Sequence, residues 1–322
     1  MSATPPYPSA HGLLSGKVVL VTAAAGTGIG FATAKRAVEE GATVVISDTH
    51  ERRLGEAADQ LAEIAGDRPL AIMCDVTVEE QVQNLFDTAA QTHGGIDVVV
   101  NNAGLGGTAN VTEMTDEQWS KVLDVTLNGT FRCTRAAMRH MQPRGKGAIV
   151  NNASVLAWRA QEGQAHYAAA KAGVMALTRC AAIEAAPFGV RINAVAPSIA
   201  MHAFLAKVTT DEVLDVLTSR EAFGRAAEPW EIANVIVFLA SNLGAAETFA
   251  EETAQLLTLL NQRARVAEEV GEIKRREGSP FFRPDRVAQV IDKIQDANQG
   301  PLLNQHVAAI WREIMSACLA LE

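Results

Sequence analysis

The stretch KVVLVTAAAGTGIG, residues 17–30, joins a short apolar run to a glycine-rich turn and the start of a helical pattern. Similar apolar runs recur along the chain, each followed by a segment with helical periodicity. They are KVVLVT (17–22), TVVIS (43–47), LAIMC (70–74), IDVVV (96–100), GAIVNNA (147–153) and VRINAVA (190–196). Strands that are apolar throughout and alternate with helices are typical of a parallel sheet covered on both faces. The pattern predicts an α/β protein with a doubly wound parallel sheet of six strands.

The pattern changes class near residue 245. After the amphipathic helix WEIANVIVFLAS (230–241), an open sheet of this kind would continue with one more strand, but no strand-like run follows. Apolar residues from Phe249 to Ile273 instead recur at spacings of three, four or seven, as on one face of a helix. Two more helical segments follow at about 284–298 and 302–321. The sequence therefore predicts a sheet that lacks its usual last strand, followed by an all-α, three-helix region.

Composition excludes several classes of function. A net charge of -9 leaves no basic excess for a nucleic acid or an anionic membrane surface, so we expect neither partner. No apolar run reaches the roughly 18 residues that a membrane span needs. The four cysteines are far apart and form no CxxC pair, which favours a reducing cytoplasm over a disulfide frame. The histidines show no metal-ligand spacing, and the Pro-rich polar residues 1–12 are expected to be a disordered tail.

The glycine-rich turn has the features of a dinucleotide site. Gly26, Gly28 and Gly30 allow a tight turn and a close approach of backbone to a pyrophosphate, which would lie at the N-terminus of the next helix. Asp48 ends the second strand, where a carboxylate can accept both ribose hydroxyls of an adenosine and repel a 2′-phosphate. The pattern favours NAD over NADP. The alternative is a plain glycine turn followed by a solvated aspartate.

Candidate catalytic residues follow the fourth and fifth predicted strands. NNAG (101–104) comes after the fourth strand, and Ser154 ends the fifth. Tyr167 and Lys171 are four residues apart, so that they share one face of a helix, and an ammonium there can lower the pKa of the phenol toward neutrality. Tyr167 would then act as the acid or base for a carbinol proton, with Ser154 bonded to the substrate oxygen.

Residues 13–243 resemble the short-chain dehydrogenase/reductase family, and in NNASVLAWRAQ, HYAAAKAGVMALTRCAAIEAA and RINAVAPSIA they look like actinobacterial members linked to steroid catabolism. The resemblance implies a Rossmann domain that transfers hydride between NAD(H) and a small-molecule alcohol or ketone. It implies catalysis by Ser154, Tyr167 and Lys171. A decayed relative kept for binding alone is the alternative. The resemblance also implies a coenzyme site formed by Thr22, Gly26, Gly28, Ile29, Gly30, Asp48, Asp75, Val76, Asn102, Ala103, Gly104, Tyr167, Lys171 and Pro197.

The chain departs from that family at several positions. Ala23 stands where the family's first glycine usually lies, and the loop carries one extra residue. Thr126 occupies the usual place of a fourth catalytic residue, an asparagine, and Asn128 is expected to face elsewhere. Ser198 and His202 replace a usual glycine and threonine near the nicotinamide. Residues 204–226 lie where the family's substrate lid lies, with a surface helix pair as an equal alternative.

Residues 255–322 closely resemble the all-helical chorismate mutase domain found at the front of bacterial bifunctional prephenate dehydratases, in strings such as NQRARVAEEVGEIKRREG and IWREIMSACLALE. Mutases of that family are intertwined dimers in which cationic side chains hold a dicarboxylate while its ether bond breaks. The resemblance places Arg263, Lys274 and Arg286 at three of the cationic positions, and Glu322 at the position that faces the ether oxygen.

Each half lacks parts of the family that it resembles. The mutase family's N-terminal arginine maps to Ala246, its glutamate after Arg286 is Val287, and its serine near the C-terminus is Cys318. The dehydrogenase half lacks its last strand. Because natural fusions usually join whole domains through a flexible linker, we favour an engineered chimera of two oligomeric enzymes that assembles with itself as a scaffold. A natural bifunctional enzyme is the alternative.

The expected domains follow from these two resemblances. They are a disordered tail (1–12), a Rossmann domain (13–243), a helical junction (244–254) and a chorismate-mutase-like dimerisation domain (255–322). In the chimera, the helix expected at 228–241 runs directly or with a kink into the helix expected at 247–276. The first half is expected to retain a dehydrogenase site and the second to be a poor mutase.

Overall fold

The computed structural model describes residues 4–201, 218–219, 221, 223–244, 276, 284–297, 304, 307 and 311, with the side chains of 284–288 excepted. The chain divides into two compact units, Met1–Ala245 and Ala246–Glu322. This boundary lies inside the junction expected at 244–254.

The first unit has the parallel sheet that the sequence predicts. Its six strands are β1 (Val18–Val21), β2 (Thr43–Asp48), β3 (Leu70–Met73), β4 (Val98–Asn101), β5 (Gly147–Asn152) and β6 (Val190–Val195). They pair in the order β3-β2-β1-β4-β5-β6, and every pair is parallel. The order reverses direction between β1 and β4. That reversal is the point at which an open α/β sheet forms a crevice at the carboxyl ends of its strands.

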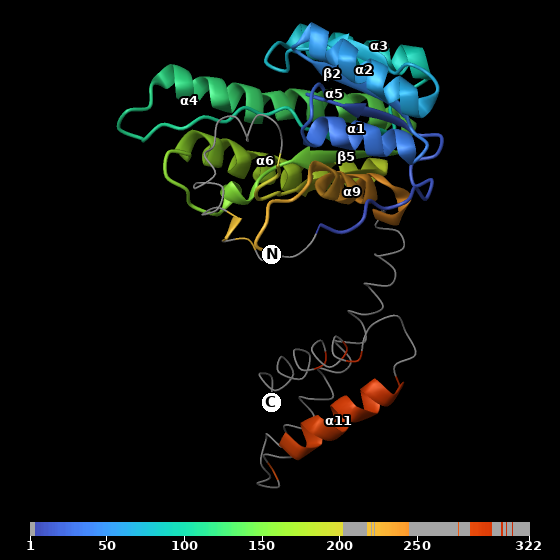
Figure 1. Cartoon of the computed structure of the whole chain (residues 1–322), viewed down its shortest axis with the longest axis vertical. Coiled ribbons are helices and arrows are strands. Elements are labelled where there is room, and N and C mark those ends of the chain that lie inside the picture. Colours follow the sequence, from blue (N-terminus) through green and yellow to red (C-terminus); the bar gives the residue numbers. More distant parts are fainter. Residues whose placement is uncertain are drawn as a thin grey trace. The chain divides into compact units, whose positions relative to one another are not determined.

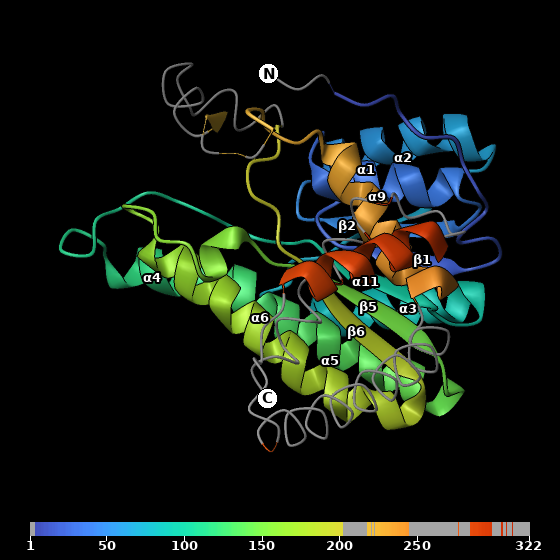
Figure 2. The same ribbon diagram turned by 90° about the horizontal axis from the view of Figure 1, so that it is seen from below.

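Helices cover both faces of this sheet (Figure 1, Figure 2). Side chains of Val19, Ile46 and Val150 belong to the core on one face, while Leu20, Val45 and Ile149 belong to the core on the other. The first face carries α1 (Ile29–Glu39), α2 (Glu51–Ala65) and α9 (Pro229–Ala240). The second carries α3 (Glu79–His93), α5 (Gly129–Met141) and α6 (Ala165–Ala185). These six helices enclose strands that are apolar on both sides, as the continuous apolar runs predict.

Shorter elements connect these layers. Helix α4 (Asp116–Leu123) leads through a single π-helical segment, η1 (Asp124–Asn128), into α5. The 3-10 turns are η2 (Gln142–Arg144), η3 (Val155–Ala157), η4 (Ala186–Phe188) and η5 (Asn242–Gly244). In the part of the chain that the structure describes, β6 is the last strand, and most residues after Gly244, where a seventh would follow, lie outside that part.

Helix α9 ends at Ala240, so the expected helix over 228–241 does not run on directly into the second unit. Ser241 has extended backbone, and its hydroxyl donates to the carbonyl of Phe238 (2.8 Å). The Arg191 guanidinium, from β6, donates to the carbonyls of Leu239, Ala240, Ser241 and Gly244. These bonds satisfy carbonyls that a continuing helix would use itself. The helix expected at 247–276 lies outside the described residues apart from Arg276, which is helical.

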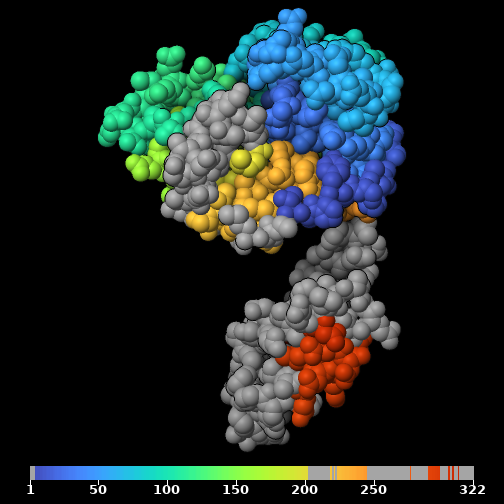
Figure 3. Space-filling view, in the orientation of Figure 1, coloured from blue at the N-terminus to red at the C-terminus, as the bar shows by residue number. Residues whose placement is uncertain are grey.

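Part of the N-terminal tail, which was expected to be disordered over residues 1–12, makes defined contacts with the rest of the first unit. The carboxylate of Glu40 accepts from the N–H groups of His11 and Leu13 (both 2.9 Å), and the Arg36 guanidinium donates to two tail carbonyls. The Tyr7 ring packs at an angle of 58° against Trp230 of α9, with 5.2 Å between the ring centres, and the tail lies beside α9 in Figure 3. The buried Arg36–Glu40 pair is the cause, because its remaining hydrogen-bonding capacity is satisfied by tail backbone.

The second unit is helical where it is described. Helix α11 (Pro284–Ala297) confirms the segment predicted at 284–298, and Asn304, Val307 and Trp311 have helical backbone. Among the described residues, no helix is long and apolar enough to span a membrane. No group of three or more His, Cys, Asp and Glu side chains in the described ranges could hold a metal ion.

Candidate active site

A cavity of about 590 Å³ opens at the carboxyl ends of β1, β2 and β4. Its walls include the glycine-rich turn, the aspartate that ends β2 and the first residues after β4. The lining residues are Ala23, Ala25, Gly26, Thr27, Gly28, Asp48, Arg52, Arg53, Glu56, Ala57, Gln60, Asn102 and Gly104. The cavity thus lies where the sequence predicts a coenzyme, at the reversal of the strand order.

The glycine-rich turn fits a pyrophosphate. Helix α1 begins at Ile29 with Gly28 as its N-cap, and no side chain bonds the N–H groups of its first turn, so these remain available to an anion. Gly26 has φ +106°, and a Cβ there or at Gly28 would point into open space. A Cβ on Gly30 would instead collide with the Ala23 carbonyl oxygen and the Asn102 amide. Gly30 is therefore required for close packing, and Gly26 for its backbone conformation.

Asp48 holds the turn as well as facing the cavity. Its carboxylate accepts from the N–H groups of Ala25 (3.2 Å) and His50 (3.1 Å), leaving lone pairs for ribose hydroxyls. Arg52 and Arg53 line the same cavity, a feature that the sequence reasoning missed, although Arg52 is paired with Glu56 at 2.6 Å. Their place in the first turn of α2, directly after Asp48, was the available signal.

Two residues expected in the coenzyme site, Asp75 and Val76, are not among those that line this cavity. The Asp75 carboxylate accepts from both the N–H (2.9 Å) and the hydroxyl (2.7 Å) of Thr77, which places it in a local turn before α3. Val76 is buried in the core. Their expected contact with a coenzyme stays a prediction.

The NNAG segment is joined to the glycine-rich turn by hydrogen bonds. Thr22 is fully buried, and its hydroxyl accepts from the N–H groups of Asn102 (3.0 Å) and Ala103 (3.1 Å). The Asn102 amide donates to the carbonyls of Thr22 (3.2 Å) and Ala23 (3.0 Å). A Cβ added to Gly104 would lie 3.4 Å from Nζ of Lys171, so this segment also adjoins the candidate catalytic lysine. The structure thus brings these predicted coenzyme residues together.

Ser154, Tyr167 and Lys171 converge from β5 and α6. Ser154 is 7% exposed, accepts from the N–H of Leu156 (3.2 Å), and is hydrogen-bonded to the Tyr167 phenol. Lys171 is 3% exposed, and its ammonium lies 5.5 Å from the centre of the Tyr167 ring. Its Nζ donates to the carbonyl of Asn152 at 2.5 Å. The serine, tyrosine and lysine therefore form one cluster, as their spacing predicts.

The pKa of Tyr167 differs from our expectation. Burial raises the pKa of the phenol above its usual value, and the hydrogen bond from Ser154 only partly opposes this. Burial also lowers the pKa of the Lys171 ammonium to about 8. The predicted lowering by the lysine is not seen; Nζ is bonded to the carbonyl of Asn152 on β5 and lies over the Tyr167 ring, 5.5 Å from its centre.

A second cavity, of about 450 Å³, is shared by Ser154 and Tyr167. Its other walls are Val155, Leu156, Arg159, Ala160, Gln161, Glu162, Ser198, Ile199 and Glu221. The Ser198 hydroxyl donates to Glu221 (2.6 Å), which also accepts from Arg159 (3.3 Å). Ser198, expected near the nicotinamide, therefore lies on this wall, while His202 falls outside the described residues. Arg159 and Glu221 were missed, because nothing in the sequence links segments 62 residues apart.

Pro197 and Ile29 were also expected in the coenzyme site. The carbonyl of Pro197 accepts from the N–H of Val155 (3.0 Å), which ties the end of β6 to η3. Ile29 is the first residue of α1 and packs against the core of its face. Each thus lies next to an element that lines a cavity.

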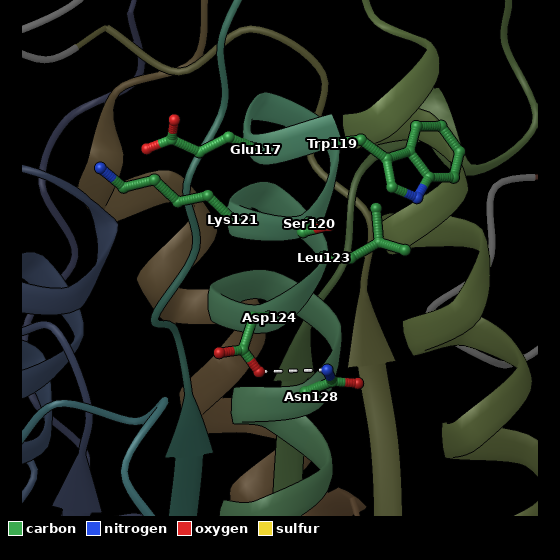
Figure 4. A pocket seen from close by; sticks show the side chains of 7 residues that line it. All are labelled: Glu117, Trp119, Ser120, Lys121, Leu123, Asp124 and Asn128. Carbon is green, nitrogen blue, oxygen red and sulfur yellow. Dashed lines mark hydrogen bonds between the residues drawn. The ribbon is translucent and has the colours of Figure 1, made fainter. Parts of the chain in front are cut away.

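Thr126 and Asn128 face different surroundings. Thr126 is fully buried, and its hydroxyl accepts from the N–H (2.9 Å) and donates to the carbonyl (3.0 Å) of Leu105. Asn128 bonds Asp124 (3.1 Å) and lines a hollow of about 660 Å³ with Glu117, Trp119, Ser120, Lys121, Leu123 and Asp124 (Figure 4). Asn128 therefore faces away from Thr126, as was expected from its position in the sequence, and does not take the place of the missing asparagine.

The chorismate-site positions are largely outside the described residues. This holds for Arg263, Lys274 and Glu322, and for Ala246 and Cys318. Arg286 and Val287 lie in the first part of α11, residues 284–288, of which only the backbone is described. The expected remnant of a mutase site stays a prediction.

Comparison with known proteins also divides the chain into two parts, a few residues beyond the boundary between the two compact units. Residues 23–249 match the family described as enoyl-(acyl carrier protein) reductase, and residues 251–322 match chorismate mutase type II. The first part is 62% identical over 244 residues to the (5R,7aS)-5-hydroxy-7a-methyl-1-oxo-2,3,5,6,7,7a-hexahydro-1H-indene-carboxyl-CoA reductase of Mycobacterium tuberculosis, covering 75% of this chain and 93% of that protein. It is 43% identical over 230 residues to the cis-4-hydroxycyclohexanecarboxylate dehydrogenase of Sinomonas cyclohexanicum, covering 70% and 90%.

Solved structures agree with this assignment of the fold. A short-chain dehydrogenase from Mycobacterium smegmatis superposes with a TM-score of 0.67 at 58% identity, covering 75% of this chain and 92% of that chain. A second structure, described as gox2181, gives a TM-score of 0.69 at 35% identity. Both matches concern the sheet domain.

Proposed function

The chain belongs to the short-chain dehydrogenase/reductase family and continues into a chorismate mutase type II domain, and on that premise we propose that its first domain transfers hydride between NAD(H) and an alcohol or ketone. The observation that carries the proposal is the placement of Ser154 and Tyr167 on one cavity, with Lys171 one helical turn away. The coenzyme cavity lies at the neighbouring strand ends. A nicotinamide coenzyme would supply the hydride acceptor or donor there.

The chain's own residues handle the proton and orient the substrate. In the reductive direction, Tyr167 donates its phenolic proton to the substrate oxygen, and its raised pKa keeps that proton in place at neutral pH. Ser154 hydrogen-bonds the same oxygen. Lys171, with its pKa near 8, places positive charge beside the phenol as negative charge develops there.

The coenzyme that fits best is NAD(H). The Asp48 carboxylate is fixed by two backbone N–H groups at the edge of the cavity, where it repels a 2′-phosphate. Arg52 would favour NADP(H), but its charge is opposed by the Glu56 carboxylate at 2.6 Å. The positive charge of Arg53, which also lines the cavity, favours NADP(H). A direct comparison of NADH and NADPH binding therefore tests the proposed preference for NAD(H).

The substrate class follows from the relatives and from the second cavity. One relative is named for a bicyclic carboxyl-CoA reductase, the other for a hydroxycyclohexanecarboxylate dehydrogenase. Leu156 and Ile199 give the cavity apolar walls, and Arg159, whose charge is opposed by the Glu221 carboxylate at 3.3 Å, contributes a cation to its lining. We therefore propose a cyclic alcohol or ketone that carries a carboxyl group or its CoA thioester.

The test is turnover of cyclic hydroxy acids, keto acids and their CoA thioesters with NAD(H), by the whole chain. We expect NADH consumption with at least one cyclic keto compound and none with acyclic ketones of the same size. If the chain bound neither NADH nor NADPH, the proposal that it is a dehydrogenase would be wrong.

For the second domain, we infer that the fusion is an engineered one in which the mutase-like unit dimerises, as a self-assembling scaffold, and its mutase site is impaired. Support comes from the adjoining family matches, which end at residue 249 and begin at 251, and from Ala246 and Val287 in place of an arginine and a glutamate. Each missing electrostatic contact of this kind is typically worth about 3 to 4 kcal/mol. A natural bifunctional enzyme is the alternative, and on either reading we infer a cytoplasmic protein.

Two measurements separate these readings. The first compares chorismate conversion by the chain and by an Ala246→Arg, Val287→Glu double variant, and the scaffold interpretation expects very low turnover that rises in the double variant. Turnover typical of the family in the unchanged chain would support the bifunctional enzyme. The second is particle mass in solution by native mass spectrometry, and a monomer would contradict the expected homo-oligomer.

A further inference from the structure

Ala23 has an unusual backbone conformation at the entrance of the coenzyme cavity. It is the one residue other than glycine with positive φ (+50°) in the part of the chain that the structure describes. An L-residue with a Cβ is disfavoured in the left-handed region because the Cβ crowds the following carbonyl oxygen. Something in the surroundings must therefore hold the chain in this conformation.

The Asn102 side chain provides that restraint. Its Nδ2 donates to the carbonyls of Thr22 and Ala23, the two peptide groups at the point where the chain turns left-handed. Gly30 brings α1 so close that its Cα lies against both Ala23 and this amide. The first residues of the coenzyme loop are thus clamped between NNAG and the N-terminus of α1.

Asn152 determines which way the Asn102 amide faces. Nδ2 of Asn152 donates to Oδ1 of Asn102 at 2.9 Å, and this bond leaves Nδ2 of Asn102 directed at the coenzyme loop. If the Asn102 amide rotated by half a turn, the NH₂ groups of Asn102 and Asn152 would face each other, and Oδ1 of Asn102 would face the carbonyl oxygens of Thr22 and Ala23. An apolar residue at 152 would remove one of the three hydrogen bonds that hold the Asn102 amide in the observed orientation, and so weaken the clamp on the coenzyme loop.

We propose that Asn152 is a positioning residue for the coenzyme: through the Asn102 amide it holds Ala23 in the left-handed conformation that shapes the coenzyme loop. The same residue accepts from Lys171 through its main-chain carbonyl, so one residue connects the loop to the catalytic lysine. This inference rests on the proposed coenzyme, but it concerns binding rather than the chemical step.

The test is coenzyme affinity in Asn152→Val, measured by NADH fluorescence titration of the whole chain. Valine keeps the β-branched shape suited to a strand end and the carbonyl that Lys171 needs, but cannot bond Asn102. We expect the dissociation constant for NADH to rise on the order of 5- to 30-fold, because the strained loop conformation is then only partly populated. The melting temperature should stay close to that of the unchanged chain.

The rescuing variant is Ala23→Gly. Glycine adopts positive φ without the Cβ clash, so the loop no longer depends on the amide clamp. In the Ala23→Gly, Asn152→Val double variant, we expect NADH affinity within about twofold of that of the Ala23→Gly single variant. A structural defect in the strand would not be repaired by a glycine in another loop. The control is Asn128→Val, the same change on an exposed asparagine that bonds Asp124.

The results for these variants decide whether Asn152 positions the coenzyme loop. An unchanged dissociation constant in a folded Asn152→Val variant overturns the inference, and so does a loss that the glycine does not repair. If Asn152→Val does not fold, Asn152→Ser takes its place, since the serine side chain is too short to reach Asn102. If the unchanged chain binds neither NADH nor NADPH, the coenzyme proposal fails first, which is a separate result.

Discussion

Asn101 and Asn151 lie one residue before Asn102 and Asn152 at the ends of β4 and β5, yet the two pairs bond different parts of the molecule. Asn101 donates to Asn151 (2.8 Å) and to Thr134 of α5 (3.1 Å), and Asn151 donates to Thr178 of α6 (2.9 Å). These four side chains, named the back network from here on, are at most 7% exposed. The back network joins the sheet to the helices of one face.

Asn102 and Asn152, named the front pair, lie on the side of the strand ends that faces the cavities, which is called the front face. Asn102 and Asn152 bond each other, the coenzyme loop and Lys171, and they are only partly buried. Because successive side chains at a strand end point in opposite directions, the repeated NN dipeptide supplies one amide to the fold and the next to the site. The comparison predicts that changes behind the sheet reduce stability, whereas changes in front reduce binding or rate.

The largest expected effect is at the front. Tyr167→Phe removes the proton that the reaction needs, and we expect kcat to fall on the order of 10²-fold or more. The melting temperature should hardly change, because the ring and its neighbours remain. The measurement is the steady-state rate with a substrate that the unchanged chain reduces. Undiminished turnover in this variant would remove Tyr167 from the mechanism.

The next effect is behind the sheet. Asn151→Leu leaves the Asn101 amide and the Thr178 hydroxyl each short of a partner in a buried site, and we expect the free energy of unfolding to fall by about 1 to 3 kcal/mol. NADH affinity of the folded fraction should not change. Urea unfolding followed by far-UV circular dichroism, with NADH titration in parallel, checks both statements. A variant of full stability but weak NADH binding would reverse the assignment of the two faces.

A third effect concerns the cavity edge at Asp48. In Asp48→Ala, the carboxylate no longer repels a 2′-phosphate, while Arg52 and Arg53 remain on the wall. We expect the preference for NADH over NADPH, as the ratio of dissociation constants, to fall on the order of tenfold. Asp67→Ala, the same change on an exposed aspartate, serves as the control. If the ratio stays constant, Asp48 does not select the coenzyme.

Sequence reasoning predicted the sheet well because each strand carries its own signal. The six apolar runs and the glycine-rich turn are local features, and Tyr167 and Lys171 share a helix face by spacing alone. Sequence reasoning failed where a contact with a residue far away in the sequence determines the local structure. Arg191 on β6 bonds the carbonyls at the end of α9, and Glu40, which follows α1, binds the N-terminal tail. Neither contact can be predicted from the sequence of the segment that it changes.

The same limit applies to the candidate site. The sequence placed an ammonium beside a phenol, but the sign of the resulting pKa change depended on burial, which only the fold reveals. Ala23 could be recognised as a departure from glycine, whereas the amide clamp that supports it needs the spatial neighbours Asn102 and Asn152.

The smallest expected effect is a dependence on pH at the front face. The pKa of Lys171 is lowered to about 8 by burial, so the ammonium is present below pH 8 and is lost as pH rises through that value. Tyr167 stays protonated over the same range, since its own pKa is raised. If the positive charge supports proton donation, kcat for reduction should fall about fourfold between pH 7 and pH 8.5, following the fraction of protonated lysine.

Lys171→Arg separates the charge from other causes of this decline. A guanidinium keeps its proton throughout the range, so the fall above pH 8 should vanish even if the absolute rate is lower. Asn151→Leu provides the matched case behind the sheet, where the pH profile should keep the shape of the unchanged chain. A decline that persists in Lys171→Arg would show that another group titrates near pH 8. The front face would then hold an ionisable partner beyond the serine, tyrosine and lysine.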